Sequence, residues 1–187
     1  MKKIDLNKLR DKAYKTACEH GFHDQELSNE HCLCLVISEL MKAVEADRKR
    51  KYFKGKIMFE RDFNLYSALV EENVRYRNAF EKHIKDTVGD KLADAVIRLL
   101  DLAGLRNLNL NRFALVNVVS KKKTFTENIY SIVKDITNYK YTLEELVNYA
   151  ITQVFVLSDI LDIDLLWHIE HKMKYNELRE EMYGKKY

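Results

Sequence analysis

Four ionisable side chains in the first half of the chain form two pairs, each with the spacing of one helical turn. Glu39 stands three residues before Lys42, and Lys91 stands three residues before Asp94. Because residues at i and i+3 project to the same side of a helix, two helices packed antiparallel would bring both pairs together. From these residue types alone, the arrangement indicates ion pairing on a solvent-facing surface.

Two predicted helices carry these pairs. The first runs from about residue 28 to residue 51, with Ser28 as N-cap and Glu30 placed to favour the helix dipole. The second starts near Asp86 and stops at Gly104 or a little beyond. Each has an apolar stripe at helical spacing beside its ionisable pair. The stripes consist of Leu33, Val36, Ile37, Leu40, Met41 and Val44 in the first helix, and of Leu92, Val96, Leu99, Leu100 and Ala103 in the second.

The rest of the chain also predicts helices joined by short connections. The sequence has no proline and only 5 glycines, whereas average usage would give about nine prolines. Proline breaks helices, so its absence favours long ones. Periodicity and capping signals, among them Gly21 as a left-handed stop, predict further helices at residues 6–19, 67–85, 126–138, 142–162 and 164–181, with Thr124 or Thr126 and Thr142 as N-caps. We therefore predict a single all-α domain spanning residues 1–187.

Two segments give weaker signals. Residues 52–66 are aromatic and irregular, and Gly55 marks a loop there. Residues 107–119 are ambiguous between an extended piece and a helix, and we favour a short helix from Asn111. The helix pair within residues 28–104 and a second pair within residues 124–162 would pack as a four-helix bundle.

Charge and hydropathy restrict the class of protein. The net charge of +3 is small and made of closely mixed signs, so no nucleic-acid partner is predicted. The start of the chain has no apolar signal region, and its longest uncharged stretch, residues 146–158, is shorter than the roughly 20 residues that span a bilayer. Three cysteines in helical patterns indicate reduced thiols. We expect a cytoplasmic protein that does not contact a membrane.

Two runs around the ionisable pairs resemble the metal motifs of a known family. Residues 35–46, LVISELMKAVEA, resemble the first helical motif (E-x-x-E) of the MazG-like, all-α nucleoside triphosphate pyrophosphohydrolases. Residues 90–101, DKLADAVIRLLD, resemble the second motif (E-x-x-D). Residues 20–31 lie where the family has its lead-in, and residues 172–187 resemble its phosphate-binding tail. The resemblance covers roughly residues 10–105 and 160–187.

The resemblance implies a fold, a reaction and a cofactor. Members of the family are helical bundles that dimerise or tetramerise, so we expect a homo-oligomer. Their four acids hold Mg²⁺, which binds the triphosphate, and water attacks the α-phosphorus to release nucleoside monophosphate and pyrophosphate. Mg²⁺ prefers carboxylate and phosphate oxygens in octahedral array. By this resemblance, Glu39 and Asp94 are catalytic metal ligands and a (deoxy)nucleoside triphosphate is the substrate.

The sequence departs from the family at two of the four acidic positions. Lys42 and Lys91 stand where the family has glutamates. An ammonium about 4 Å from Mg²⁺ would be repelled by roughly 8 kcal/mol at an effective dielectric constant of about 20. That energy is comparable with a micromolar binding energy. The change therefore predicts a disabled or weakened metal site.

Two alternatives follow from this departure. In the first, Lys42 and Lys91 pair with Asp94 and Glu39, and ion pairs replace the metal in a catalytically inactive relative that still binds nucleotide. In the second, neighbouring acids rebuild a weaker Mg²⁺ site, with Asp90 the best placed because it lies one turn before Asp94. We favour the first alternative. Glu45 and Asp101 are the other neighbouring acids, but Glu45 lies six residues from Glu39 and points elsewhere.

The C-terminal helix supplies the other candidate site residues. By resemblance, cationic side chains would contact phosphate, and Tyr175 and Asn176 would contact the sugar or base; the cations are Lys172, Lys174 and Arg179. A cationic helix end favoured by the dipole is the alternative. His168 and His171 on the same helix are expected to be a surface pair rather than a zinc site, because no H-E-x-x-H pattern is present. The rival function is that of a non-catalytic helical protein that binds nucleotide or a protein partner.

Overall fold

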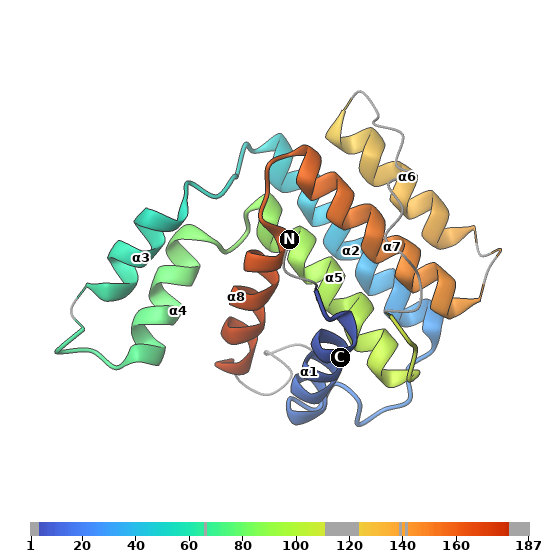
Figure 1. Cartoon of the computed structure of the whole chain (residues 1–187), viewed down its shortest axis with the longest axis horizontal. Helices are drawn as coiled ribbons and strands as arrows, with labels where there is room; N and C mark the ends of the chain where they lie inside the picture. The colour runs from blue at the N-terminus through green and yellow to red at the C-terminus, as the bar shows by residue number, and fades with distance from the viewer. Residues whose placement is uncertain (1–3, 66, 111–123, 139, 141, 180–187) are drawn as a thin grey trace.

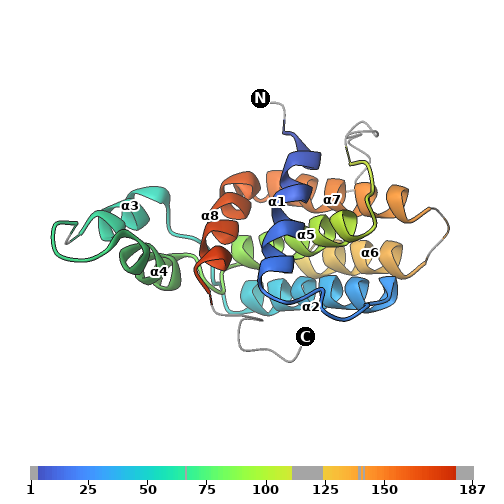
Figure 2. The same cartoon turned by 90° about the horizontal axis from the view of Figure 1, so that it is seen from below.

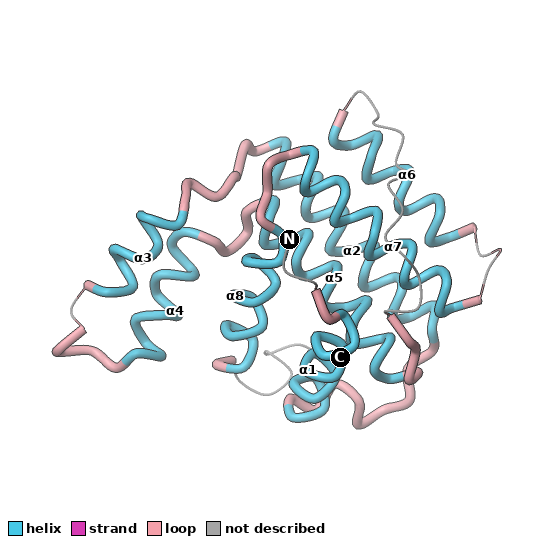
Figure 3. The backbone as a smooth tube through the Cα atoms, in the orientation of Figure 1, coloured by secondary structure: helices cyan, strands magenta, loops and turns pink. Residues whose placement is uncertain are grey.

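The computed structural model describes residues 4–65, 67–110, 124–138, 140 and 142–179, and in these residues the protein is all-helical with no strand (Figures 1 and 3). The predicted all-α class is confirmed for this part of the chain. The helices are α1 (Leu6–Glu19), α2 (Asn29–Arg48), α3 (Lys56–Asn64), α4 (Glu72–His83), α5 (Val88–Leu105), α6 (Phe125–Thr137), α7 (Leu143–Ile160) and α8 (Leu165–Glu177).

Helix α5 is the central element of the molecule. It packs against α2 and α7 on one side and against α1 and α8 on the other, while α6 closes a ring by packing against α2 and α7. Figures 1 and 2 show α2, α5, α6 and α7 lying alongside one another, with α1 and α8 set across α5. The core side chains of α5 are almost completely shielded from solvent, as expected for a helix covered on both sides.

Polar caps fix where most helices begin. Ser28 accepts a hydrogen bond from the His31 N–H at the start of α2. Thr124 and Thr142 form complete capping boxes at the starts of α6 and α7. Each such cap satisfies a backbone donor that the helix itself leaves unpaired. The predicted caps at Ser28 and Thr142 are confirmed, and of the two candidates for α6 the N-cap is Thr124. Gly21 follows the end of α1 with φ of 77°, as predicted.

Two boundary predictions are wrong. Residues 52–66 were expected to be irregular, but α3 occupies most of this segment because Phe59 and Phe63, four residues apart, pack on α4 and α8. The helix expected from Ser67 begins only at Glu72, after a turn. The presence of α3 and the start of α4 both depend on aromatic side chains that are buried between helices. Such tertiary packing outweighs local helix propensity. The short helix predicted from Asn111 lies outside the described residues.

Helices α3 and α4 form an arm beside the main bundle (Figure 1). The arm has its own aromatic cluster, in which Phe59, Tyr76 and Phe80 pack with Tyr175 of α8. Trp167 lies at the edge of the cluster and stacks on Phe53. The arm is therefore joined to the bundle through α8, which carries the C-terminal candidate residues.

Two glycines allow α5 to approach its neighbours closely. A Cβ atom added at Gly89 would lie 2.5 Å from Nε2 of His168 on α8. A Cβ at Gly104 would collide with Tyr14 on α1. Contact distances this short are not tolerated between side chains, so glycine at these positions sets the spacing of α8 and α1 from α5.

Among the described helices, none is both long and apolar enough to cross a membrane by itself. Helices α7 and α8 pass a length and composition test only when taken together, and they meet at an angle of 115°.

Candidate functional site

An ammonium group lies between two carboxylates at the crossing of α5 and α8. Lys172 Nζ donates to Asp90 Oδ1 at 2.8 Å and lies 2.8 Å from Asp94 Oδ2. Asp90 is one turn before Asp94 on α5, so both carboxylates face α8. The close approach of the two helices at Gly89 allows Lys172 to reach them. The result is a buried ion-pair triad.

Local structure holds Asp90 in place. Its Oδ2 accepts a hydrogen bond of 2.8 Å from the Asp86 N–H, and its own N–H donates to the capping Oγ1 of Thr87. Asp86 adopts a positive φ of 63° just before the cap. The start of α5 thus holds the carboxylate through contacts that do not involve α8.

Burial and charge act against each other in this triad. Burial raises the pKa of Asp90, and the attraction of Lys172 only partly offsets it. Burial also opposes ionisation of Asp94, but Lys172 and Lys91 outweigh it and lower the pKa of Asp94. The two carboxylates in turn raise the pKa of Lys172 against the effect of its own burial. Lys172 is therefore a charged ammonium in the protein interior.

The two lysines of the altered motif extend the ion-pair network. Lys91 Nζ lies 2.7 Å from Asp86 Oδ1, 3.2 Å from Asp90 Oδ2 and 4.0 Å from Asp94 Oδ2. Lys42 Nζ donates to Glu39 Oε1 at 2.9 Å. Each lysine therefore pairs mainly with acids of its own helix or the loop before it. The crosswise pairs expected from the sequence, Lys42 with Asp94 and Lys91 with Glu39, are not among the contacts of the described residues.

Charge in the network is balanced. Its acids are Glu39, Asp86, Asp90 and Asp94, and its bases are Lys42, Lys91, Lys172 and Arg98, so four negative charges meet four positive ones. Arg98 makes the longest contact, 3.9 Å from its Nε to Glu39 Oε1.

A pocket of about 70 Å³ opens beside this network, between α1, α2, α5 and α8. Its polar lining includes two residues predicted to be metal ligands and two predicted to contact nucleotide. The polar residues are Thr16, Glu39, Asp94, Arg98, Asp101, Asn176 and Arg179. The structure thus places Glu39 and Asp94 on one pocket together with the end of α8.

Asn176 is the residue of this pocket whose hydrogen bonding is incomplete. Its side chain is 6% exposed. Its Oδ1 is buried and has no hydrogen-bond partner among the described residues. A buried polar atom without a partner costs about 1–3 kcal/mol, so a ligand that supplies a donor here would recover that energy.

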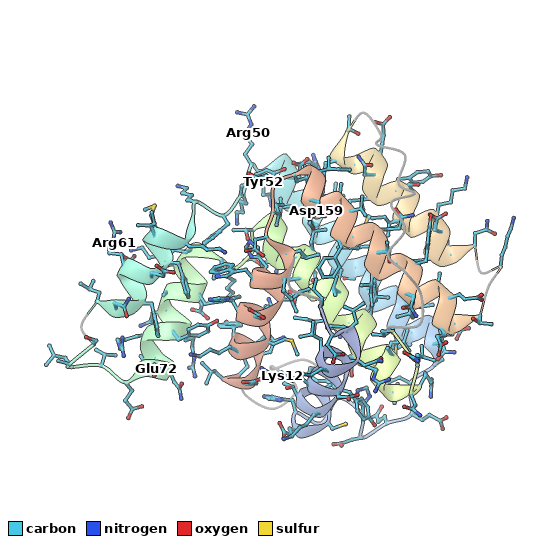
Figure 4. All side chains as sticks on the ribbon, viewed as in Figure 1. Lys12, Arg50, Tyr52, Arg61, Glu72 and Asp159 are labelled. Atoms are coloured by element: carbon cyan, nitrogen blue, oxygen red, sulfur yellow. The ribbon has the colours of Figure 1, made fainter. Side chains whose placement is uncertain are left out.

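The remaining C-terminal candidates point away from the pocket. Lys174 pairs with Glu72 at 3.1 Å and lies 4.4 Å from the centre of the Tyr76 ring, on the arm. Glu72 is labelled in Figure 4, near the lower end of the arm. Tyr175 donates to Glu81 at 2.6 Å and stacks on Phe80. Both side chains therefore attach the arm to α8. Their predicted roles in phosphate and sugar binding stay predictions.

The prediction that His168 and His171 form a surface pair is wrong. His168 is 3% exposed and fills the space above Gly89, and burial lowers its pKa to about 4. His171 is partly buried, stacks on Trp167, and has its pKa lowered by burial as well. The cause is the close packing of α8 on α5 and the arm, which the spacing of the histidines does not reveal.

The donor set does not fit Mg²⁺. A divalent cation needs several carboxylate oxygens facing one point. In this site an ammonium occupies the space between Asp90 and Asp94, and Glu39 is engaged by Lys42. Within the described ranges, no group of three or more His, Cys, Asp or Glu side chains is arranged to hold a metal.

Arg98 is a site residue that its place on one face of α5 could have revealed. Asp94, Arg98 and Asp101 follow one another at intervals of four and three residues, and all three line the pocket. This polar stripe is visible in the sequence and would have identified Arg98 as a site residue. Asp101 is itself positioned by His23, whose Nε2 lies 2.7 Å from Asp101 Oδ1. No signal in the sequence points to that second contact.

No protein-family model matches the chain, and no curated protein or solved structure matches it either.

Proposed function

We propose that this chain is a homologue of the MazG-like nucleoside triphosphate pyrophosphohydrolases that retains the nucleotide pocket and has lost most or all of the hydrolysis of (d)NTP to (d)NMP and pyrophosphate. The observation that carries the proposal is the position of Lys172, 2.8 Å from carboxylate oxygens of both Asp90 and Asp94. This cation already neutralises Asp94, a metal ligand by the resemblance, and Asp90, the acid best placed to replace a missing ligand.

Retention of a pocket is supported by its lining. Arg98 and Arg179 present guanidinium groups, which pair with phosphate in a fixed two-donor geometry. Asn176 adds a buried acceptor that lacks a donor, as a site for a sugar hydroxyl or base N–H would have. Together, these groups match a phosphorylated ligand with a polar sugar or base.

A second candidate is a protein-binding role without nucleotide. The arm exposes large apolar side chains, among them Ile57 at 82% and Leu69 at 83%. Such exposure on a two-helix arm is a feature of contact surfaces between proteins. A nucleotide-binding measurement separates this candidate from the first.

The test is pyrophosphate release from a panel of NTPs and dNTPs with Mg²⁺ or Mn²⁺. The native protein is compared with a Lys42→Glu, Lys91→Glu, Lys172→Met triple variant, which places acids at both altered positions and removes the ammonium between Asp90 and Asp94. The triple variant carrying Asp94→Asn serves as the control. We expect no turnover by the native protein and turnover by the triple variant that Asp94→Asn abolishes. Metal-dependent turnover by the native protein would refute the loss of catalysis.

The triple variant brings like charges together near Asp86 and Asp90 and removes the Lys172 partner of Asp90, so its folding must be checked by circular dichroism with and without Mg²⁺. Lys42→Glu alone is the safer companion, because the Lys42 side chain is half exposed. In parallel, each nucleotide is tested for a rise in the melting temperature of the native protein. Ligand at about 100 times its Kd adds about 2.7 kcal/mol of stability. No rise with any nucleotide would favour the protein-binding candidate.

A further inference from the structure

We infer that the pocket binds the phosphates of its nucleotide directly through Arg98, Arg179 and Lys42, with no divalent cation between protein and ligand. This inference rests on the proposed function, since it concerns the same pocket. It goes beyond that proposal by stating which form of the ligand is bound: the free polyphosphate anion rather than its Mg²⁺ complex.

The charge balance of the site is the first argument. Four carboxylates in one place would repel a nucleoside triphosphate unless a metal bridged them. Here the four carboxylates of the network are matched by four cations. The two other charged residues of the pocket lining, Asp101 and Arg179, add one charge of each sign. Metal is therefore not needed to offset the acids, and the polyphosphate meets a site of no net charge.

The available donors are the second argument. Among the contacts of the described residues, the Arg98 side chain makes a single ion pair, with Glu39, at 3.9 Å. That distance is too long for a hydrogen bond, so its N–H donors are not held by this contact. Because Arg98 lines the pocket, these donors can turn to a phosphate. Arg179, two residues beyond the end of α8, is the second arginine of the pocket lining.

Lys42 supplies a third cation that can move. Its side chain is 49% exposed and makes one hydrogen bond, to Glu39. Lys42 is not itself a lining residue, but its Nζ lies 2.9 Å from Oε1 of Glu39, which lines the pocket. A long, flexible lysine can exchange a carboxylate for a phosphate oxygen at little cost, because both the old and the new contact are charge-assisted. Lys172, by contrast, is held by two carboxylates in the interior and has no such freedom.

The effect of Mg²⁺ follows from these donors. Mg²⁺ on a nucleotide cancels two of the phosphate charges and occupies oxygens that Arg98 and Lys42 would otherwise contact. In a site with four carboxylates the metal would bring protein and ligand together. In this site it competes with the cationic side chains, so chelation of Mg²⁺ leaves binding unchanged or strengthens it.

The experiment is isothermal titration of the full chain with each of the common NTPs and dNTPs, once in excess EDTA and once in excess MgCl₂. For the nucleotide that binds, we expect a Kd in EDTA equal to or below the Kd in MgCl₂. Binding in EDTA should weaken with added salt, as contacts between exposed charges do. Arg98→Gln should raise the Kd in EDTA by about tenfold or more, as loss of a charge-assisted contact does.

Two further variants guard the interpretation. Arg61→Gln changes an exposed arginine of α3, labelled in Figure 4 on the arm away from the pocket, and should leave the Kd unchanged. Lys42→Gln alters a half-exposed residue and is the substitute for Arg98→Gln if circular dichroism shows that the latter does not fold; it should raise the Kd by about threefold or more.

The outcomes are distinct. Binding that requires MgCl₂ overturns this inference and leaves the nucleotide pocket of the proposed function intact. No binding in either buffer overturns the proposed function and the inference with it. If the nucleotide binds in EDTA and neither Arg98→Gln nor Lys42→Gln weakens this binding, the nucleotide lies elsewhere. That result overturns the inference alone.

Discussion

Replacing Lys172 by methionine tests whether the buried ion pairs hold α8 onto α5. Methionine keeps most of the side-chain volume but leaves Asp90, which is fully buried, without its closest cation. Removing one partner of a buried pair costs about 3–5 kcal/mol, because the other charge remains in the interior. Native domains have a free energy of unfolding of about 5–15 kcal/mol. The loss is thus a large part of the total stability.

Lys174→Met is the matched control, two residues further along α8. Lys174 and its partner Glu72 are both substantially exposed, and exposed pairs contribute about 1 kcal/mol or less. Both variants are measured by urea unfolding followed by far-ultraviolet circular dichroism. We expect Lys172→Met to lose several times more free energy of unfolding than Lys174→Met, with similar slopes.

The pH dependence of the loss identifies its cause. Without Lys172, the pKa of Asp90 in the folded protein lies further above its unfolded value, since burial already raises it. A group whose folded pKa is raised takes up a proton more readily when folded, so lowering the pH from 7 relieves the loss as Asp90 becomes neutral. The double variant Lys172→Met, Asp90→Asn should likewise recover part of the stability. A loss equal to that of Lys174→Met, or one that is the same at pH 7 and at low pH, would refute the reasoning.

Three other changes test the packing. Gly89→Ala should destabilise the protein by about 1–3 kcal/mol, because the new Cβ collides with the ring of His168. This loss exceeds the gain of about 1 kcal/mol that alanine brings as the better helix former. A variant that is more stable than the native protein in thermal unfolding would contradict this contact. Burial lowers the pKa of His168 from 6.5 to about 4, so the folded protein holds the ring neutral. The free energy of unfolding that this contributes is fully present above pH 6.5 and is lost as the pH falls toward 4. Between pH 7 and pH 5 the native protein should therefore lose about 2 kcal/mol more free energy of unfolding than His168→Gln, and equal losses would argue against a buried neutral ring. Thr142→Ala removes a capping box and should cost about 1 kcal/mol in urea unfolding, whereas Thr137→Ala at the exposed end of α6 should cost less.

Local signals in the sequence predicted much of the fold. Caps such as Ser28 and Thr142 and the apolar stripe of α5 depend on neighbours within a few residues, so the sequence shows them directly. Helix α3 was missed because its nine residues are stabilised by the aromatic contacts of Phe59 with α4 and α8, not by a cap or a long stripe. Contacts of that kind depend on elements far apart in the chain.

The candidate site also has one part that local sequence signals predict and one part that they do not. Glu39 and Asp94 could be placed near each other from helical spacing and an assumed helix pair, and both line one pocket. The position of Lys172 between Asp90 and Asp94 joins residues 82 and 78 positions apart, and it depends on how closely α8 approaches Gly89. Neither residue type nor spacing encodes that approach, so a residue expected to contact phosphate proves to be held by two carboxylates.

The central claim of the proposed function is that ion pairs with lysine stand where MazG-like pyrophosphohydrolases would hold a divalent cation. Its most direct test is a titration of Mn²⁺ monitored by electron paramagnetic resonance, with no nucleotide present. The native protein is compared with the Lys42→Glu, Lys91→Glu, Lys172→Met triple variant. We predict that the native protein leaves Mn²⁺ free in solution, whereas the triple variant binds it and loses this binding when Asp94→Asn is added. Tight Mn²⁺ binding by the native protein that Asp94→Asn abolishes would contradict the account.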